Sequence, residues 1–268
     1  MKLAKWIILG LYFIIGGYFV FAATSAIPSD VIILKDSNTV ALTAVVDGAS
    51  VGKVISELYK LDQKNTSEPI YLVLNTPGGS IEDGFNLMTV AQGLHRKVNT
   101  VTVFAASMGF QIAQALGDRY ITQYGTLMSH KAKGGFQGEF PGQVNSRLNY
   151  WLDRVMEMDK VTVSRTHGKQ TLEGYRSAYA NELWLTGSKS VAEGYADKVI
   201  GVRCDKSLMG SYQERVETLF GTVDVTWSQC PLITEPIAVK YPKVGLEQYN
   251  YIESVLKQKL DDRKQVRN

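Results

Sequence analysis

Two apolar runs in the middle of the chain constrain its fold most. Residues 69–75, PIYLVLN, lack the alternation of a half-exposed strand, and residues 98–105, VNTVTVFA, form a second β-rich run. Such runs are typical of strands buried on both faces of a parallel sheet. Residues 81–95 between them repeat apolar side chains at helical spacing. We therefore predict an α/β fold in which parallel strands alternate with covering helices.

The same alternation continues on both sides of this pair. Residues 51–61 carry apolar side chains on one helical face, and residues 108–116 predict another helix. We expect residues 118–130, DRYITQYGTLMSH, to form a strand, a turn and a second strand, and residues 141–167 to form a long helical region. A length of 268 residues is ample for one large buried core.

The N-terminus has the features of an export signal. Lys2 and Lys5 precede a long apolar stretch, and no other charged residue occurs before Asp30. A positive start, an apolar stretch and a small-residue end are typical of a secretory signal, although about 20 apolar residues also suffice for an uncleaved anchor. We expect residues 1–28 to be a signal peptide or membrane anchor, and the remainder to be extracytoplasmic: periplasmic, secreted or anchored facing outside. The net charge of +3 is scattered and indicates no nucleic-acid partner.

The two cysteines fit an oxidising compartment. Cys204 and Cys230 both lie in the C-terminal third, where we expect them to form a disulfide, the alternative being two free buried thiols. Neither has the Cys or His spacing of a metal site. The sequence indicates no metal and no organic cofactor.

Two predicted strand ends carry unusual residues. Gly78 and Gly79 directly follow the strand that ends near residue 75. Adjacent glycines there either form a simple turn or expose main-chain N–H groups that can hold a developing oxyanion. Ser107 follows the next strand and precedes an apolar helix, so it is either a helix N-cap or a nucleophile beside the positive end of that helix.

A serine nucleophile needs a base, and the chain has three histidines. His95 and His167 lie at predicted helix ends and are expected on the surface. His130 closes a strand-like run two elements after Ser107, so both should emerge at the same edge of the sheet.

Four motifs together resemble the proteolytic subunit of Clp protease, the ClpP family. They are YLVLNTPGGSIEDGFNLM, AASMG, LMSHKAKGGFQG and TGSKSVAEGYADKVI, in that order and at matching spacing within residues 40–202. The resemblance implies an α/β fold of the ClpP/crotonase type, in which β-β-α units repeat as a spiral and a parallel sheet is flanked by helices. It also implies a domain division: 1–28 signal or anchor, 29–203 peptidase domain, and 204–268 a C-terminal extension with the cysteines and an amphipathic helix.

The resemblance assigns roles to several of these residues. Ser107 corresponds to the nucleophile and His130 to the general base, while Gly79 and Met108 would supply the oxyanion-hole N–H groups. The segment after the histidine corresponds to a handle that pairs with extended substrate. The substrate-binding residues are then Gly78, Gly134 and Gly135.

One position departs from the family pattern. An ungapped alignment places Ala178 where the family has its catalytic aspartate. Asn181 and Glu182 are the nearest polar side chains, and we predict Asn181 as a weaker third partner of His130. In a related triad, loss of the charged acid costs up to about 10⁴ in kcat.

The resemblance predicts an exported or membrane-anchored serine endopeptidase that acts on peptides or unfolded protein through an acyl-enzyme. One alternative is a weak or inactive scaffold, because the acid is missing. Another is a membrane peptidase of the signal-peptide-peptidase type, in which Lys131, Lys133 or Lys160 would act as base. Acyl-CoA chemistry of the crotonase type lacks a nucleotide pocket in this sequence.

The resemblance also implies a homo-oligomeric ring with residues 141–167 between rings. Cytosolic relatives work with ATP-driven unfoldases, and an exported protein would have no ATP, so we expect no such partner. The extension would replace that partner's docking, cap a pore or change the oligomer.

Overall fold

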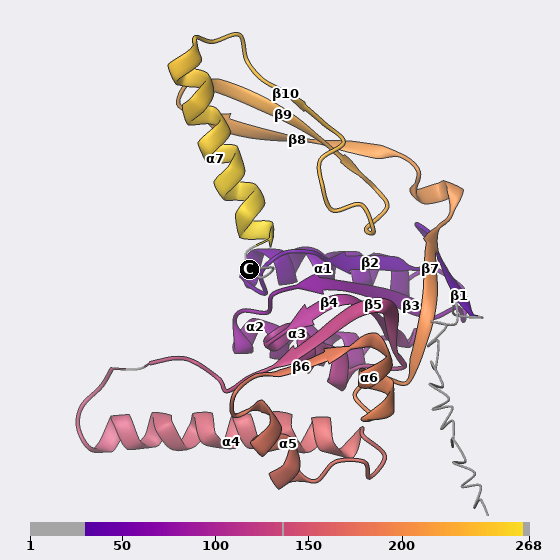
Figure 1. Ribbon diagram of the computed structural model, residues 1–268, viewed down its shortest axis with the longest axis vertical. Helices are drawn as coiled ribbons and strands as arrows, with labels where there is room; N and C mark the ends of the chain where they lie inside the picture. Colours follow the sequence, from indigo (N-terminus) through magenta and orange to yellow (C-terminus); the bar gives the residue numbers. More distant parts are fainter. Residues whose placement is uncertain (1–29, 136, 265–268) are drawn as a thin grey trace, which may run out of the picture.

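The computed structural model describes residues 30–135 and 137–264 (Figure 1). The predicted signal or anchor, residues 1–28, lies outside this range. Among the described residues, no helix combines the length and apolar character needed to span a membrane.

The described chain folds into a seven-stranded sheet flanked by helices, followed by a smaller three-stranded sheet. The strand order of the large sheet is β1-β7-β5-β4-β3-β2, with every pair parallel, and β6 joins β5 antiparallel. The prediction of a parallel α/β fold is therefore confirmed. The elements of this part are β1 (Val31–Leu34), β2 (Thr39–Leu42), α1 (Gly48–Asp62), β3 (Ile70–Thr76), α2 (Ile81–Gln92), β4 (Val98–Ala106), α3 (Met108–Ala115), β5 (Arg119–Ser129), α4 (Gly142–Ser164), α5 (Leu172–Tyr179), β6 (Leu183–Thr186), α6 (Gly187–Ala192) and β7 (Lys198–Cys204).

The prediction of a turn inside residues 118–130 is wrong, because β5 is one continuous strand. β4 pairs with residues 119–121 and again with 126–128, and its register shifts between these stretches. An irregularity in the ladder thus takes the place of the expected turn, and Gly125 lies within it. The exposed Tyr124 belongs to the same stretch.

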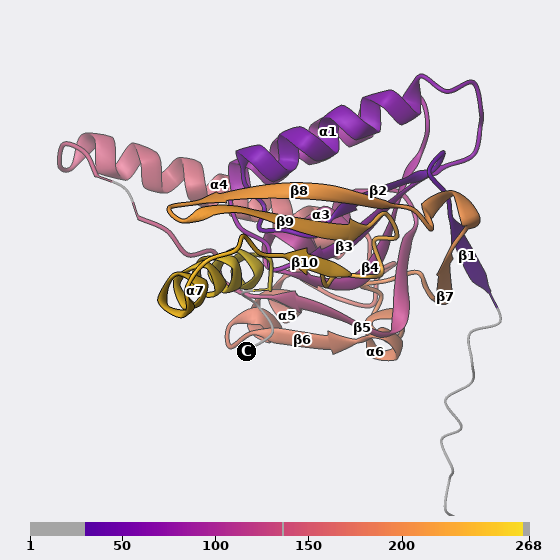
Figure 2. The same cartoon turned by 90° about the horizontal axis from the view of Figure 1, so that it is seen from above.

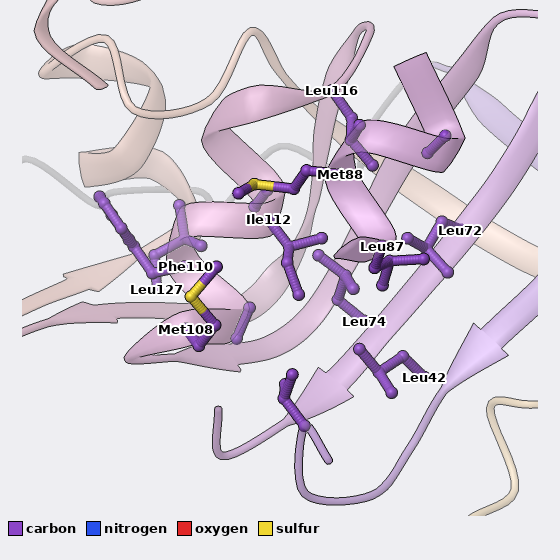
Figure 3. Close-up of a cluster of buried hydrophobic side chains, with 14 of the residues drawn as sticks. Leu42, Leu72, Leu74, Leu87, Met88, Met108, Phe110, Ile112, Leu116 and Leu127 are labelled. Carbon is purple, nitrogen blue, oxygen red and sulfur yellow. The ribbon is translucent and has the colours of Figure 1, made fainter. Parts of the chain in front are cut away.

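One face of the large sheet packs on α1, α2 and α3. Figure 3 shows the centre of this core, where side chains from β3 meet those of α2 and α3. Its labelled members include Leu72, Leu74, Leu87, Met108 and Ile112, all almost completely buried.

The C-terminal extension packs on the opposite face of the large sheet. Its elements are β8 (Ser211–Thr218), β9 (Gly221–Ser228), β10 (Ala238–Lys240) and α7 (Leu246–Lys264). Leu208, Cys230 and Leu232 of the extension join an apolar cluster with β3, β4 and β7. A disulfide between Cys204 and Cys230 connects the end of β7 to the loop after β9. The extension is therefore fixed to the body by both a covalent bond and an apolar cluster.

A buried ion pair ties the start of β5 to the loop before β7. The guanidinium of Arg119 is only 2% exposed and contacts the carboxylate of Asp197 at 2.5 Å. It also donates to Gln114 and to the carbonyl of Arg165. Burial opposes ionisation of Asp197, but hydrogen bonds and positive charge from Arg119 outweigh it, so the pKa of this carboxyl lies below its usual value.

Candidate active site

Ser107 occupies a strained turn between β4 and α3. Its backbone has φ 55° and ψ −118°, a conformation that non-glycine residues rarely adopt. Its N–H donates to the carbonyl of Met128 on β5 at 2.9 Å, which fixes the turn on the neighbouring strand. Ser107 stands at the N-cap position of α3, but its hydroxyl makes no capping bond to the helix, so the side chain does not serve as a cap. A serine in a strained strand-to-helix turn is the arrangement that exposes a nucleophile in other hydrolases.

The glycine loop after β3 lies directly against this turn. Gly78 has φ 89°, and a Cβ built on it would lie 2.4 Å from the carbonyl oxygen of Ala106 and 2.7 Å from Cβ of Ser107. No side chain fits there, because real Cβ atoms do not approach so closely. The glycine is needed so that the two main chains can touch.

The loop is held from its other side by Val46. The N–H of Val46 donates to Gly78, and the N–H of Ser80 donates to the carbonyl of Val46, both at 2.8 Å. In this bridge the N–H of Gly79 points away from Val46, and it enters no hydrogen bond among the described residues. The N–H of Met108, first in α3, has no partner within its own helix. The sequence predicted these two N–H groups as the donors to an oxyanion. One lies on the glycine loop and the other on the serine turn, the two segments that pack together at Gly78.

His130 follows β5 immediately. Ala106 pairs with Met128 in the parallel ladder, so Ser107 and His130 both emerge just beyond the last paired residues of two neighbouring strands. Adjacent strands lie about 4.8 Å apart. The structure therefore brings the serine and histidine of the sequence prediction to one edge, although no hydrogen bond joins their side chains among the described residues. Catalytic hydrogen bonds are often long before substrate binds.

The imidazole has no third partner among the described residues. His130 Nδ1 is buried and makes no hydrogen bond. Ala178 and Asn181 are exposed, and the carboxylate of Glu182 accepts a bond from the indole of Trp184 at 3.1 Å instead. Asn181 as the third partner stays a prediction.

A buried polar network beneath His130 was missed in the sequence. The hydroxyl of Tyr175 lies 2.8 Å from Oγ of Ser129, the residue before His130, and accepts from the Gln111 side chain. Thr162 on α4 bonds to the same glutamine. Burial raises the pKa of Tyr175 to about 12, so its hydroxyl stays protonated. The only sequence signal for this network was a polar residue, Ser129, at the end of a buried strand. Its partner, Tyr175, lies 46 residues further along the chain and could not be identified from it.

A buried carboxylate lies beside this network. Asp159 on α4 is 3% exposed at its side chain and accepts bonds from Arg176 and from the hydroxyl of Tyr179 on α5. Both donors lie on α5, so these hydrogen bonds to Asp159 connect α4 to α5.

The segment after His130 extends away from the body. Residues 131–135 are exposed and belong to no strand, and a Cβ on Gly134 or Gly135 would meet nothing within 4 Å. The segment leads into α4, whose N-terminal half projects beyond the sheet (Figure 1). Open main chain beside His130 is free to pair with an extended ligand, and pairing by Gly134 and Gly135 stays a prediction.

Comparisons with known proteins agree with this geometry. A family model described as Clp protease matches residues 27–203. The ATP-dependent Clp protease proteolytic subunit of Streptococcus gordonii is 27% identical over 173 residues, which cover 63% of this chain and 86% of that protein. The residues matched by the family model include the glycine loop, the serine turn and the histidine strand, and the matched range ends just before Cys204. The chain therefore belongs to the Clp protease family.

Proposed function

We propose that the chain is a serine endopeptidase in which Ser107 forms an acyl-enzyme with His130 as base. Family membership supports a serine-type peptidase, and members of this family form oligomers and bind peptides. The observation that carries the mechanism is the strained Ser107 turn with the glycine loop packed on it.

The steps follow from the groups at this edge. His130 takes the hydroxyl proton as Ser107 Oγ attacks the scissile carbonyl, and the oxygen, now negative, is held by the N–H groups of Gly79 and Met108. The peptide C–N bond then breaks, and the imidazolium gives its proton to the leaving amine. Water, deprotonated by His130, attacks the ester and releases Ser107 and the second product.

An inactive or weak scaffold is the second candidate, and one observation favours it. Nδ1 of His130 is buried without a hydrogen-bond partner, so no acceptor among the described residues stabilises the imidazolium through it. A weak dyad and a scaffold differ in turnover, which the experiment below measures. A lysine base has no comparable support: Lys131, Lys133 and Lys160 are all exposed.

The proposal also includes export of the enzyme from the cytoplasm and its assembly into a homo-oligomer. The N-terminal features support an extracytoplasmic or membrane-anchored enzyme that works without an ATP-driven unfoldase. The exposed apolar side chains of α4, Leu148, Tyr150 and Leu152, support a homo-oligomer that uses this helix as an interface.

Hydrolysis of a fluorescently labelled unfolded casein tests the function. The wild-type chain should release small fluorescent peptides, and Ser107→Ala should abolish release. Ser188→Ala, an exposed serine at the start of α6, is the matched control and should retain it. No hydrolysis by the wild-type chain, or equal hydrolysis by Ser107→Ala, would remove the endopeptidase proposal.

A further inference from the structure

A cavity of about 1010 Å³ lies between the edge of the large sheet and the C-terminal extension. Figure 1 shows the small sheet with β8 and β9 apart from α1 and β2, and Figure 2, the view from above, shows that it overlies them. Its body wall contains all six residues from Thr39 to Ala44, and its opposite wall comes from the extension, including Tyr212, Trp227 and Ile233. The wall thus contains every residue of β2 (Thr39–Leu42) and the two residues that follow it. Because consecutive residues line it, the main chain of the strand, and not only its side chains, faces the cavity.

β2 is an edge strand, and half of its main-chain groups point away from the sheet. The N–H of Tyr71 on β3 donates to the carbonyl of Asn38, so Val40 and Leu42 also direct their groups towards β3. The groups of Thr39 and Ala41 consequently point outward. Within residues 30–135 and 137–264 no hydrogen bond engages the outward N–H groups of these two residues. An open row of this kind is a template for another strand.

The size of the cavity suits one added strand. Six extended residues span about 20 Å, and a strand in a packed sheet occupies about 4.8 Å by 10 Å in cross-section. The product is on the order of 950 Å³, close to the cavity's volume.

The lining of the cavity carries more acidic than basic side chains. Asp36, Asp47 and Glu57 border the cavity, and none of them forms an ion pair with another described residue. The single lysine in the lining, Lys53, lies over the ring of Tyr212 at 5.9 Å. The excess of carboxylates favours a positively charged segment.

The cavity also reaches the candidate active site. Pro77, which precedes Gly78, and Phe104, three residues before Ser107, both belong to its lining. A chain lying along β2 would therefore end close to the glycine loop.

We propose that this cavity binds an extended, basic polypeptide segment as an extra strand on β2, with main-chain hydrogen bonds to Thr39 and Ala41. Its identification as part of the substrate rests on the proposed function, whereas binding itself does not. The site lies on the far side of the glycine loop from the open segment after His130, so it adds affinity for polypeptides with a basic stretch outside the cleaved bond.

The test measures binding by the full chain carrying Ser107→Ala, so that no hydrolysis occurs. Fluorescence anisotropy follows a labelled ten-residue peptide with lysine at alternate positions and its counterpart with glutamate. The lysine peptide should bind at least tenfold more tightly. Asp36→Lys combined with Glu57→Lys should weaken its binding at least tenfold, whereas Glu253→Lys on α7, outside the lining, should leave it unchanged.

Ala41→Pro removes an outward N–H and should also weaken binding at least tenfold. Urea unfolding of the same substituted chains, compared with the unsubstituted chain, shows whether they are folded. Equal binding of both peptides, or no effect of the charge reversals, would overturn the proposal. If Ala41→Pro instead lowers the oligomer mass in sedimentation without affecting peptide binding, a second copy occupies the edge and the proposal is also wrong. Failure of hydrolysis with intact peptide binding would overturn only the proposed function.

Discussion

Replacement of Gly78 by alanine should disable the candidate site while leaving the fold intact. The new Cβ would lie 2.4 Å from the carbonyl oxygen of Ala106 and 2.6 Å from the nitrogen of Met108. Carbon and oxygen in contact normally lie about 3.3 Å or more apart, so the glycine loop and the serine turn must separate by close to 1 Å. A displacement of about 1 Å can cost about 10² in rate, and the loss of one oxyanion donor costs about 10²–10³, or about 3–4 kcal/mol.

The left-handed φ of 89° at Gly78 adds strain, since an alanine in this region costs about 1–2 kcal/mol. We therefore expect kcat for a fluorogenic peptide to fall by about 10²–10³, with a loss of about 1–3 kcal/mol in the free energy of unfolding. Gly52→Ala is the matched control, because its Cβ would meet nothing within 4 Å on the exposed face of α1. It should retain full activity and gain up to about 1 kcal/mol in stability.

Peptide hydrolysis at saturating substrate and urea unfolding of the same samples measure both quantities. A Gly78→Ala chain that is folded and within twofold of wild-type kcat would refute the reasoning. In that case the contact between the two main chains would not position the oxyanion donors.

Three further predictions concern the supports of the site and of the extension. Asp197→Asn should lower the free energy of unfolding by about 2 kcal/mol at pH 7, because it leaves the buried Arg119 without its counter-charge. Because the pKa of the Asp197 carboxyl is lowered in the folded state, its stabilisation of the fold is fully present above about pH 5 and is lost as the pH falls through that lowered pKa. The free energies of unfolding of wild type and Asp197→Asn, measured in urea, should therefore differ less at pH 3 than at pH 7. Loss of the disulfide in Cys204→Ser with Cys230→Ser, which closes a loop of sequence separation 26, should cost about 3.5 kcal/mol in thermal or urea unfolding; an unchanged midpoint would show that the bond does not constrain the unfolded chain. Tyr175→Phe should lower kcat with little change in KM, since it frees Ser129 next to His130; a shift in KM alone would contradict a positioning role.

Local patterns in the sequence were sufficient for the framework of the molecule. The apolar run that became β3, the helical spacing of α2 and the junction at Ser107 each reflect burial and periodicity within a few residues, and the structure has a parallel sheet there. The glycine pair was also visible, because only glycine permits the conformations at φ 89° and φ 148°.

What could not be predicted depends on contacts between distant segments. The turn expected near Gly125 is replaced by an irregularity in the β4–β5 ladder, which depends on the register of a partner strand. The contact between Tyr175 and Ser129 joins residues with no shared local pattern. The cavity beside β2 exists only because the extension folds back over the sheet, and nothing in its sequence specifies that direction.

The most direct test of the central claim is the rate at which Ser107 reacts with a fluorophosphonate, followed by mass spectrometry. If His130 activates this hydroxyl, labelling should map to Ser107 alone. His130→Ala should slow it by at least about 10², whereas Lys131→Ala should leave it unchanged. Labelling that is equally fast without His130, or that maps to another serine, would contradict the claim.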